Sequence, residues 1–295
     1  MNRLIQSIEF CRVLQIFYPY SLQIFTDISA GHIKNDYLYD TSIEKVNYTG
    51  AFTPGVGRIY RESIKNEKKH FWWWTANKIF SYLTISKGFN GVVMFLEDDL
   101  ILIQDFFYML IYMTNIAKTL PQCEFISLGS VMNNYDNAYS IDLTSWDPKL
   151  HTSAIAFDVA VWKIILKNHE LFCNVDDNSW SRSLLYLSLN QKHNQRFKVL
   201  HSQIPRAIKI PVCSYSFFRR CNEIDNIIEI LSKYNKIKTT LYPPYVEIYT
   251  NIEIEDDEYV IFEGLGGWNH PNDIALCRDI MFNESIVLLN GMKIT

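Results

Sequence analysis

The sequence predicts a single α/β domain over residues 1–295, with a mixed, mostly parallel sheet flanked by helices. Short apolar runs with the length of strands alternate along the chain with longer segments that have helical periodicity. The run at residues 91–96 is apolar without alternation, which is typical of a strand that is covered on both faces. The chain contains no internal repeat, so a solenoid or a propeller is not indicated.

The first half of the chain contains the longest predicted elements. An apolar and aromatic run predicts a strand at residues 13–17, and a polar stretch with few periodic apolar positions predicts a loop at 26–57. Helical spacing of apolar residues predicts helices at 62–87 and 105–120, on either side of the strand at 91–96.

The second half continues the alternation with shorter elements. Short apolar runs predict strands at 125–128, 154–157 and 198–200, and periodic segments predict helices at 162–167, 183–189 and 226–234. Beyond the proline pair at 243–244 the composition is typical of loops.

Three consecutive acids, Glu97, Asp98 and Asp99, follow the strand at 91–96. Ligands of open α/β sheets bind beyond the carboxyl ends of strands. Adjacent carboxylates disfavour one another's charge unless a cation compensates, and Mg²⁺ or Mn²⁺ takes oxygen ligands that are often shared with phosphates. Alternatively, the acids cap the helix that follows, where negative charge is also favourable. The residue types alone leave a metal site and a helix cap open.

The overall charge and hydropathy exclude some classes of partner. The chain has 28 basic and 32 acidic residues, a net charge of −4, which does not indicate a nucleic-acid partner or an anionic membrane surface. The longest apolar stretch, residues 13–25, is too short for a membrane span and contains polar residues and a proline.

Several short motifs occur in an order and spacing that resemble one enzyme family. They are Phe95-Leu-Glu-Asp-Asp99, Leu128-Gly129, Asn174-Val-Asp-Asp177 before Trp180, Gln203-Ile-Pro-Arg206, and Gly266-Gly-Trp268 with Cys277 nearby. Together they resemble the Golgi β-1,2-N-acetylglucosaminyltransferases, and within these the N-acetylglucosaminyltransferase II family, over nearly the whole chain.

The resemblance implies a GT-A-like fold, a location in the Golgi lumen, Mn²⁺ as cofactor, UDP-GlcNAc as donor and the α-1,6-arm mannose of an N-glycan as acceptor. By position in the family's motifs, Asp99 is expected to bind the metal, and Glu97 and Asp98 to line the donor site. Trp180 and His151 are expected at the acceptor site. The resemblance also implies two disulfides, Cys213–Cys221 and Cys173–Cys277.

The chain departs from the family at two positions that carry chemistry. Ser181 stands where the family has the aspartate that serves as catalytic base, and Lys209 stands where it has a histidine that binds the metal. The first strand of the family's domain is expected upstream of Met1. These departures leave a second function open, a catalytically impaired homologue or incomplete gene product that binds a glycan or a partner protein.

Overall fold

The computed structural model describes residues 8–21, 63–129, 139–191, 196–210, 222–252 and 264–282. The predicted loop at 26–57 and the expected disulfide between Cys213 and Cys221 lie outside these residues. Within the described ranges, no helix has the length and apolar character needed to cross a membrane.

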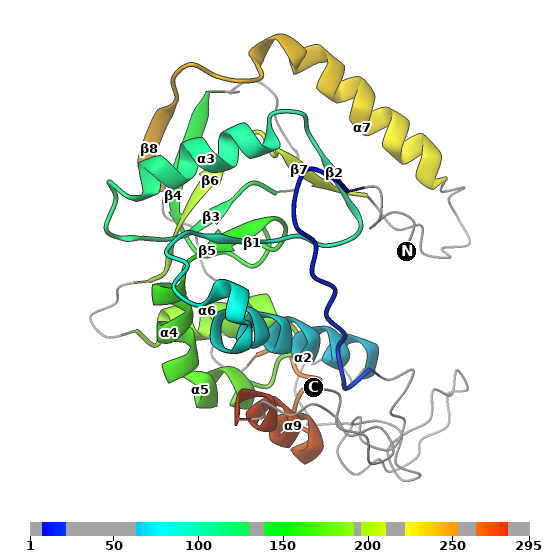
Figure 1. Cartoon of the computed structure of the whole chain (residues 1–295), viewed down its shortest axis with the longest axis vertical. Coiled ribbons are helices and arrows are strands. Elements are labelled where there is room, and N and C mark those ends of the chain that lie inside the picture. Colours follow the sequence, from blue (N-terminus) through cyan, green and yellow to red (C-terminus); the bar gives the residue numbers. More distant parts are fainter. Residues whose placement is uncertain are drawn as a thin grey trace.

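A six-stranded sheet forms one half of the molecule (Figure 1), in the order β1-β5-β3-β6-β4-β8. Its strands are β1 (Val93–Phe95), β3 (Cys123–Ser127), β4 (Ser140–Ser145), β5 (Ile155–Phe157), β6 (Lys198–Ser202) and β8 (Glu247–Ile252). β3 runs parallel to β6 and β4 runs parallel to β8, whereas the other three neighbouring pairs are antiparallel. The predicted mixed α/β class is confirmed, with fewer parallel pairs than predicted.

A separate ribbon of two antiparallel strands, β2 (Leu100–Leu102) and β7 (Ala207–Lys209), lies beside the large sheet (Figure 1). Neither strand was predicted from the sequence. Leu100 pairs with Lys209, so the ribbon brings the residue after Asp99 opposite the last residue of β7.

The predicted helices are present, but the one predicted at 62–87 is an α-helix only to Asn77 and is followed by a π-helix (Lys78–Tyr82) and a 3-10 turn (Thr84–Ser86). The predicted helices are α2 (Ser63–Asn77), α3 (Phe106–Ala117), α4 (Val159–Lys167), α6 (Trp180–Leu189) and α7 (Glu223–Ile237). Asp158, Ser179 and Asn222 cap α4, α6 and α7, because each side-chain oxygen accepts a backbone N–H of the first turn. The structure adds α5 (His169–Asn174) and α9 (Pro271–Phe282), which the sequence did not indicate.

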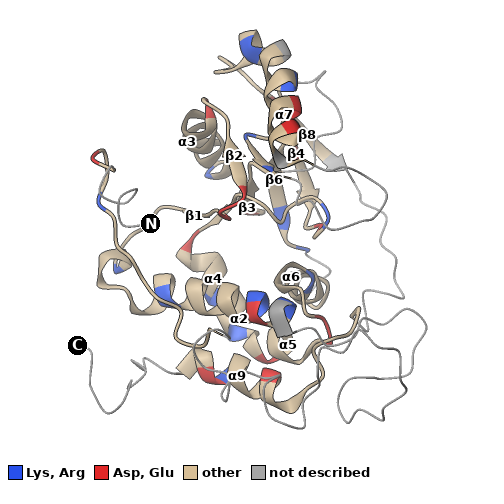
Figure 2. Cartoon of the chain, turned by 90° about the vertical axis from the view of Figure 1, so that its right-hand side faces the viewer, with Lys and Arg blue, Asp and Glu red and all other residues tan. Residues whose placement is uncertain are grey.

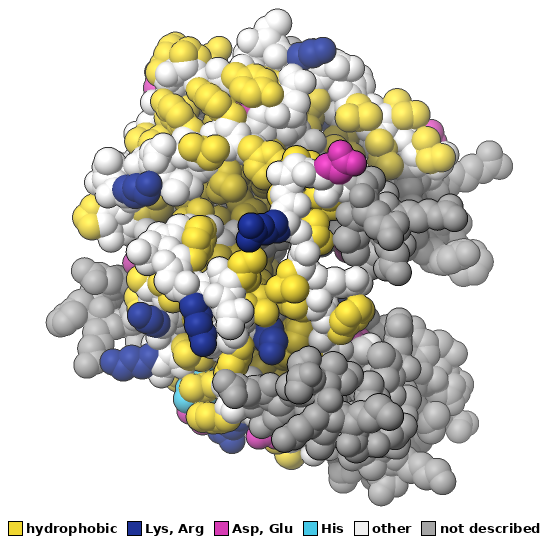
Figure 3. All heavy atoms as spheres, in the orientation of Figure 1, with side chains coloured by type: hydrophobic (Ala, Val, Ile, Leu, Met, Phe, Trp, Pro, Cys, Tyr) yellow, Lys and Arg dark blue, Asp and Glu magenta, His cyan; other side chains and the backbone are white. Residues whose placement is uncertain are grey.

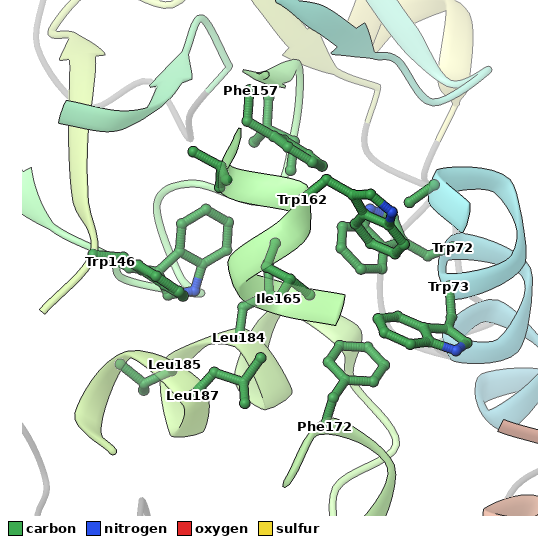
Figure 4. Close-up of a cluster of buried hydrophobic side chains, with 14 of the residues drawn as sticks. Trp72, Trp73, Trp146, Phe157, Trp162, Ile165, Phe172, Leu184, Leu185 and Leu187 are labelled. Atoms are coloured by element: carbon green, nitrogen blue, oxygen red, sulfur yellow. The ribbon is translucent and has the colours of Figure 1, made fainter. Parts of the chain in front are cut away.

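Side chains of the central strands alternate between two hydrophobic clusters. Phe125 of β3 and Phe157 of β5 belong to a cluster shared with α2, α4, α5, α6 and α9, in which Trp72 and Trp73 pack (Figure 4). Their neighbours Ile126 and Ala156 belong to a second cluster, shared with α3. The sheet is therefore covered on both faces, as the apolar character of its strands predicts.

The outer side of α3 remains apolar. Hydrophobic side chains gather over the upper part of the face in Figure 3, in the region of α3, where Phe107 and Ile111 are exposed. Their neighbours on the inner side of the helix, Met109 and Met113, are buried against the sheet.

The strand predicted at residues 13–17 is wrong. The segment has no ladder partner among the described residues, and Val13, Leu14 and Phe17 are exposed. An apolar run forms a strand only when another strand satisfies its backbone groups. Here the chain instead continues to Tyr18, whose ring packs edge-on against Trp74 of α2 with 5.5 Å between centroids.

A disulfide joins α5 to α9. Cys173 and Cys277 are bonded, with 5.8 Å between their Cα atoms, which confirms the pairing expected from the resemblance. Both residues are fully buried in the cluster that contains Trp72 and Trp73.

A buried ion pair connects α3 to β7. Arg206 donates from Nε to both carboxylate oxygens of Asp105 at 3.0 Å, and neither side chain is exposed. Arg206 also donates from Nη1 to the Ile204 carbonyl at 2.6 Å. Asp105 Oδ2 accepts a further bond from the Tyr242 backbone N–H at 3.2 Å. These bonds replace much of the hydration that both charges lose on burial.

A second buried cation, Lys69 of α2, lies beneath the start of α6. Its Nζ donates to the Asp177 carbonyl at 2.7 Å and lies 3.9 Å from the centroid of the Trp268 ring. Burial lowers the pKa of Lys69 to about 7, against the raising effect of Asp177, Asp273 and Asp176. Desolvation of the ammonium therefore outweighs the attraction of the nearby carboxylates.

We predict that Arg206→Met lowers the free energy of unfolding by about 3–5 kcal/mol, because it leaves the Asp105 carboxylate buried without a cation. Urea unfolding followed by circular dichroism measures the change. The control is Arg278→Met, which breaks an exposed ion pair with Glu170 and should cost much less. Equal losses of unfolding free energy in the two variants would show that burial does not increase the contribution of the Arg206–Asp105 pair to stability.

We also predict a pH dependence of stability from Lys69. Its pKa of about 7 in the folded state lies below the usual lysine pKa of 10.5. Between these values the unfolded state binds the extra proton, so stability should rise with pH from about 7 to about 10, by at most about 1.4 kcal/mol per pH unit. Below this window both states are protonated and the full cost of burying the charge is present.

The measurement is the difference in unfolding free energy between the wild type and Lys69→Met at pH 7, 8, 9 and 10. Subtracting the variant removes the contributions of other titrating groups. A difference that does not change with pH would mean that Lys69 has a normal pKa in the folded protein.

Candidate active site

The three acids lie on the connection between β1 and β2. β1 ends at Phe95 and β2 begins at Leu100, and the backbone N–H of Ile210 donates to the Asp99 carbonyl at 2.9 Å. The interpretation of the acids as a helix cap is wrong, because β2 separates them from α3. The cap position of α3 is held by Asp105, whose side chain binds Arg206 instead of the helix N-terminus.

Figure 2 shows acidic positions in the region between the strands and the helices α2 and α4. Glu97 and Asp98 are exposed, and Asp99 is partly buried. The expected donor-site residues therefore lie just beyond the carboxyl end of β1, where solvent can reach them.

Lys209 faces two of these acids. Its Nζ donates a hydrogen bond to Glu97 Oε2 and lies 3.4 Å from Asp99 Oδ2. Burial lowers the pKa of Lys209, but its hydrogen bond and charge interaction with Glu97, reinforced by Asp99, raise the pKa by more. Lys209 is therefore a protonated cation among the carboxylates.

The described residues do not fit a divalent metal at this position. They contain no group of three or more His, Cys, Asp or Glu side chains that could hold one ion. Asp99 Oδ1 is buried and has no hydrogen-bond partner within the described ranges, and this single oxygen would suit a cation. Glu97 Oε2 and Asp99 Oδ2 lie against the ammonium of Lys209, which repels a metal ion.

The second group of expected site residues lies at the start of α6. Ser181 is buried, and its hydroxyl is 2.9 Å from the hydroxyl of Ser179, the residue that caps the helix. The carbonyl of Ser181 accepts a hydrogen bond from Trp146 Nε1 at 2.9 Å. Trp180 is partly buried and presents its ring at the first position of the helix.

Aromatic ring contacts connect the segment before the acids to α6. The rings of Trp72 and Trp180 are nearly parallel, with 4.6 Å between centroids and an interplanar angle of 4°. Trp72 also lies 6.2 Å from the ring of Phe95, two residues before Glu97. Trp72 was not among the expected site residues, because its place in an aromatic run is equally typical of core packing, and it is buried in the hydrophobic core.

His151 is fully buried beside Trp146 and His201. Its centroid lies 5.9 Å from that of Trp146 and 5.1 Å from that of His201. Its Nδ1 accepts from the Asp147 backbone N–H at 2.9 Å. Burial, with the neighbouring His201, lowers the pKa of His151 well below its usual value, and burial lowers that of His201 to about 4. Both rings are neutral near pH 7, and contact between His151 and an acceptor stays a prediction.

The paired acids before Trp180 organise backbone turns. Asp177 accepts from the backbone N–H of Ser179 at 2.9 Å and of Leu265 at 3.0 Å. Asp176 Oδ1 accepts from the backbone N–H of Trp268 at 2.9 Å. At Gly264, which has a φ of +74°, an added Cβ would lie 2.2 Å from the Asp176 carbonyl oxygen, so only glycine permits this approach.

Comparison with known proteins supports the family resemblance seen in the sequence. The family model for N-acetylglucosaminyltransferase II (MGAT2) matches residues 1–277. The chain is similar to the alpha-1,6-mannosyl-glycoprotein 2-beta-N-acetylglucosaminyltransferases of Sus scrofa (26% identity over 285 residues), Homo sapiens (27% over 288) and Arabidopsis thaliana (25% over 286).

These matches cover 94% of this chain for the Sus scrofa and Homo sapiens proteins and 95% for the Arabidopsis thaliana protein. The matched regions are 63%, 63% and 64% of the relatives' own lengths, so the chain spans less than two thirds of each relative. On the extent of the family match and the order of the motifs, the chain belongs to the N-acetylglucosaminyltransferase II family.

Proposed function

We propose that this chain transfers GlcNAc from UDP-GlcNAc, in β-1,2 linkage, to the α-1,6-arm mannose of N-glycans, on a GT-A-like fold. The family match supports the reaction class, and the names of the relatives supply the acceptor. The observation that carries the proposal is the ring contact of Trp72 with both Phe95 and Trp180, stacked on Trp180 and tilted against Phe95, which connects the acids after β1 to the start of α6.

The proposed location is the Golgi lumen, which the family resemblance implies. The Cys173–Cys277 disulfide supports an oxidising compartment, because disulfides persist there and are rare in the cytosol.

In this reaction the acceptor hydroxyl bonds to the anomeric carbon while the bond between that carbon and UDP breaks. The hydroxyl proton then needs a base on the acceptor side. Trp180, stacked on Trp72, offers an apolar ring surface for a sugar at that side. Ser181, the next residue, carries a hydroxyl that is already hydrogen-bonded to Ser179, and a serine hydroxyl is a poor base. We infer that proton removal limits the rate of transfer.

We predict that Ser181→Asp raises the rate of transfer by about 10²–10⁴-fold, the usual contribution of a general base. A carboxylate is compatible with this position, because the first turn of a helix favours negative charge. The assay uses UDP-GlcNAc and a mannose-terminated N-glycan, and mass spectrometry detects the addition of one GlcNAc.

The matched control is Ser181→Asn, which has nearly the same shape as the aspartate but cannot act as a base. Equal rates for the two variants would contradict the assignment of residue 181 to the base position. If neither the wild type nor Ser181→Asp transfers GlcNAc although UDP binds, the chain is the non-catalytic homologue that the sequence left open.

A further inference from the structure

The backbone around Lys209 holds its side chain against the acids. Lys209 pairs with Leu100 in the β2–β7 ribbon, and the next residue, Ile210, donates its N–H to the Asp99 carbonyl at 2.9 Å. Two strands therefore fix the Cα of Lys209 beside the segment that carries Glu97 and Asp99. The contact between the ammonium and the acids follows from strand register.

The position of the ammonium excludes a metal ion from the same carboxylates. Lys209 Nζ hydrogen-bonds to Glu97 Oε2 and lies 3.4 Å from Asp99 Oδ2. A divalent ion would need these oxygens as ligands and would then lie within a few ångströms of a positive charge.

We propose that Lys209 is the built-in cation of this site and replaces a divalent metal, so that the chain binds the diphosphate of its nucleotide without Mn²⁺. The inference rests on the proposed function, which supplies the nucleotide donor.

The ammonium of Lys209 can donate a further hydrogen bond, which supports this role. A lysine ammonium has three N–H donors, and Glu97 and Asp99 engage two of them. The Lys209 side chain is 48% exposed, so the third donor is accessible to a phosphate oxygen. One ammonium attracts a diphosphate less strongly than a divalent ion does. In addition, Glu97 and Asp99 already neutralise part of its positive charge. Nucleotide binding should therefore be weak and should weaken further with salt.

The test compares UDP binding in EDTA and in MnCl₂, measured by isothermal titration calorimetry, for the wild type and three variants. For the wild type, we expect dissociation constants that agree within roughly twofold in the two buffers. Electron paramagnetic resonance should detect no Mn²⁺ bound to the wild-type protein alone.

Lys209→Met should weaken UDP binding in EDTA by about tenfold or more, because it removes the only cation assigned to the diphosphate. Lys209→His should bind UDP only with Mn²⁺ and should bind Mn²⁺ alone, because it frees Glu97 Oε2 and Asp99 Oδ2 and adds a neutral nitrogen ligand. The control, Lys233→Met, removes an ammonium of similar exposure that pairs with Glu229 on α7, and should behave as the wild type.

A wild-type affinity for UDP that rises about tenfold or more with Mn²⁺, or Mn²⁺ bound to the wild type alone, would overturn the inference and leave the proposed function standing. No UDP binding in either buffer would overturn the proposed function and the inference with it. These two results come from the wild type, so the test does not depend on the variants folding.

Discussion

The buried ion pair between Arg206 and Asp105 is the constraint on which the arrangement of the site depends. The backbone N–H groups of Arg206 and Ala207 both donate to the Leu128 carbonyl, at 2.7 and 3.0 Å, and the Arg206 carbonyl accepts from the Ile103 N–H at 2.8 Å. The end of β3, the end of β2 and the start of β7 therefore meet at Arg206. Because β7 begins at the next residue, the ion pair sets where Lys209 lies relative to the acids.

Two lysines show how the surroundings decide what a cation does. Lys69 is fully buried among aromatic rings, and its pKa falls because desolvation outweighs the nearby carboxylates. Lys209 is half exposed and touches two carboxylates, and its pKa rises because their attraction outweighs partial burial. The first is a structural donor to the Asp177 carbonyl, and the second is a charge available at the surface.

The motifs that resemble the family mainly build the fold. An added Cβ at Gly129 would lie 2.5 Å from the Ser153 carbonyl oxygen, Arg206 anchors β7, and Asp176 binds the backbone of Trp268. Ser181 and Lys209, where the resemblance implies a departure from the family's motifs, lie among the residues expected to do chemistry. The residues that indicate the family are thus different from the residues that would bind a metal or remove the acceptor proton. Metal binding and proton removal therefore have to be tested separately from family membership.

Local patterns in the sequence were sufficient for β1, α3 and the acids after β1, because apolar periodicity records which face of an element is buried. They missed β4, whose Ser140, Thr144 and Ser145 are polar yet buried between β6 and β8. They also predicted a strand at 13–17 that has no partner among the described residues. The family resemblance, and not the spacing of the cysteines, gave the Cys173–Cys277 pair. The sequence by itself therefore determined the class of fold, the family and the strand end that carries the acids. Only the tertiary structure decided that Lys209 meets Glu97, since 112 positions separate them and their contact depends on strand register and a distant ion pair.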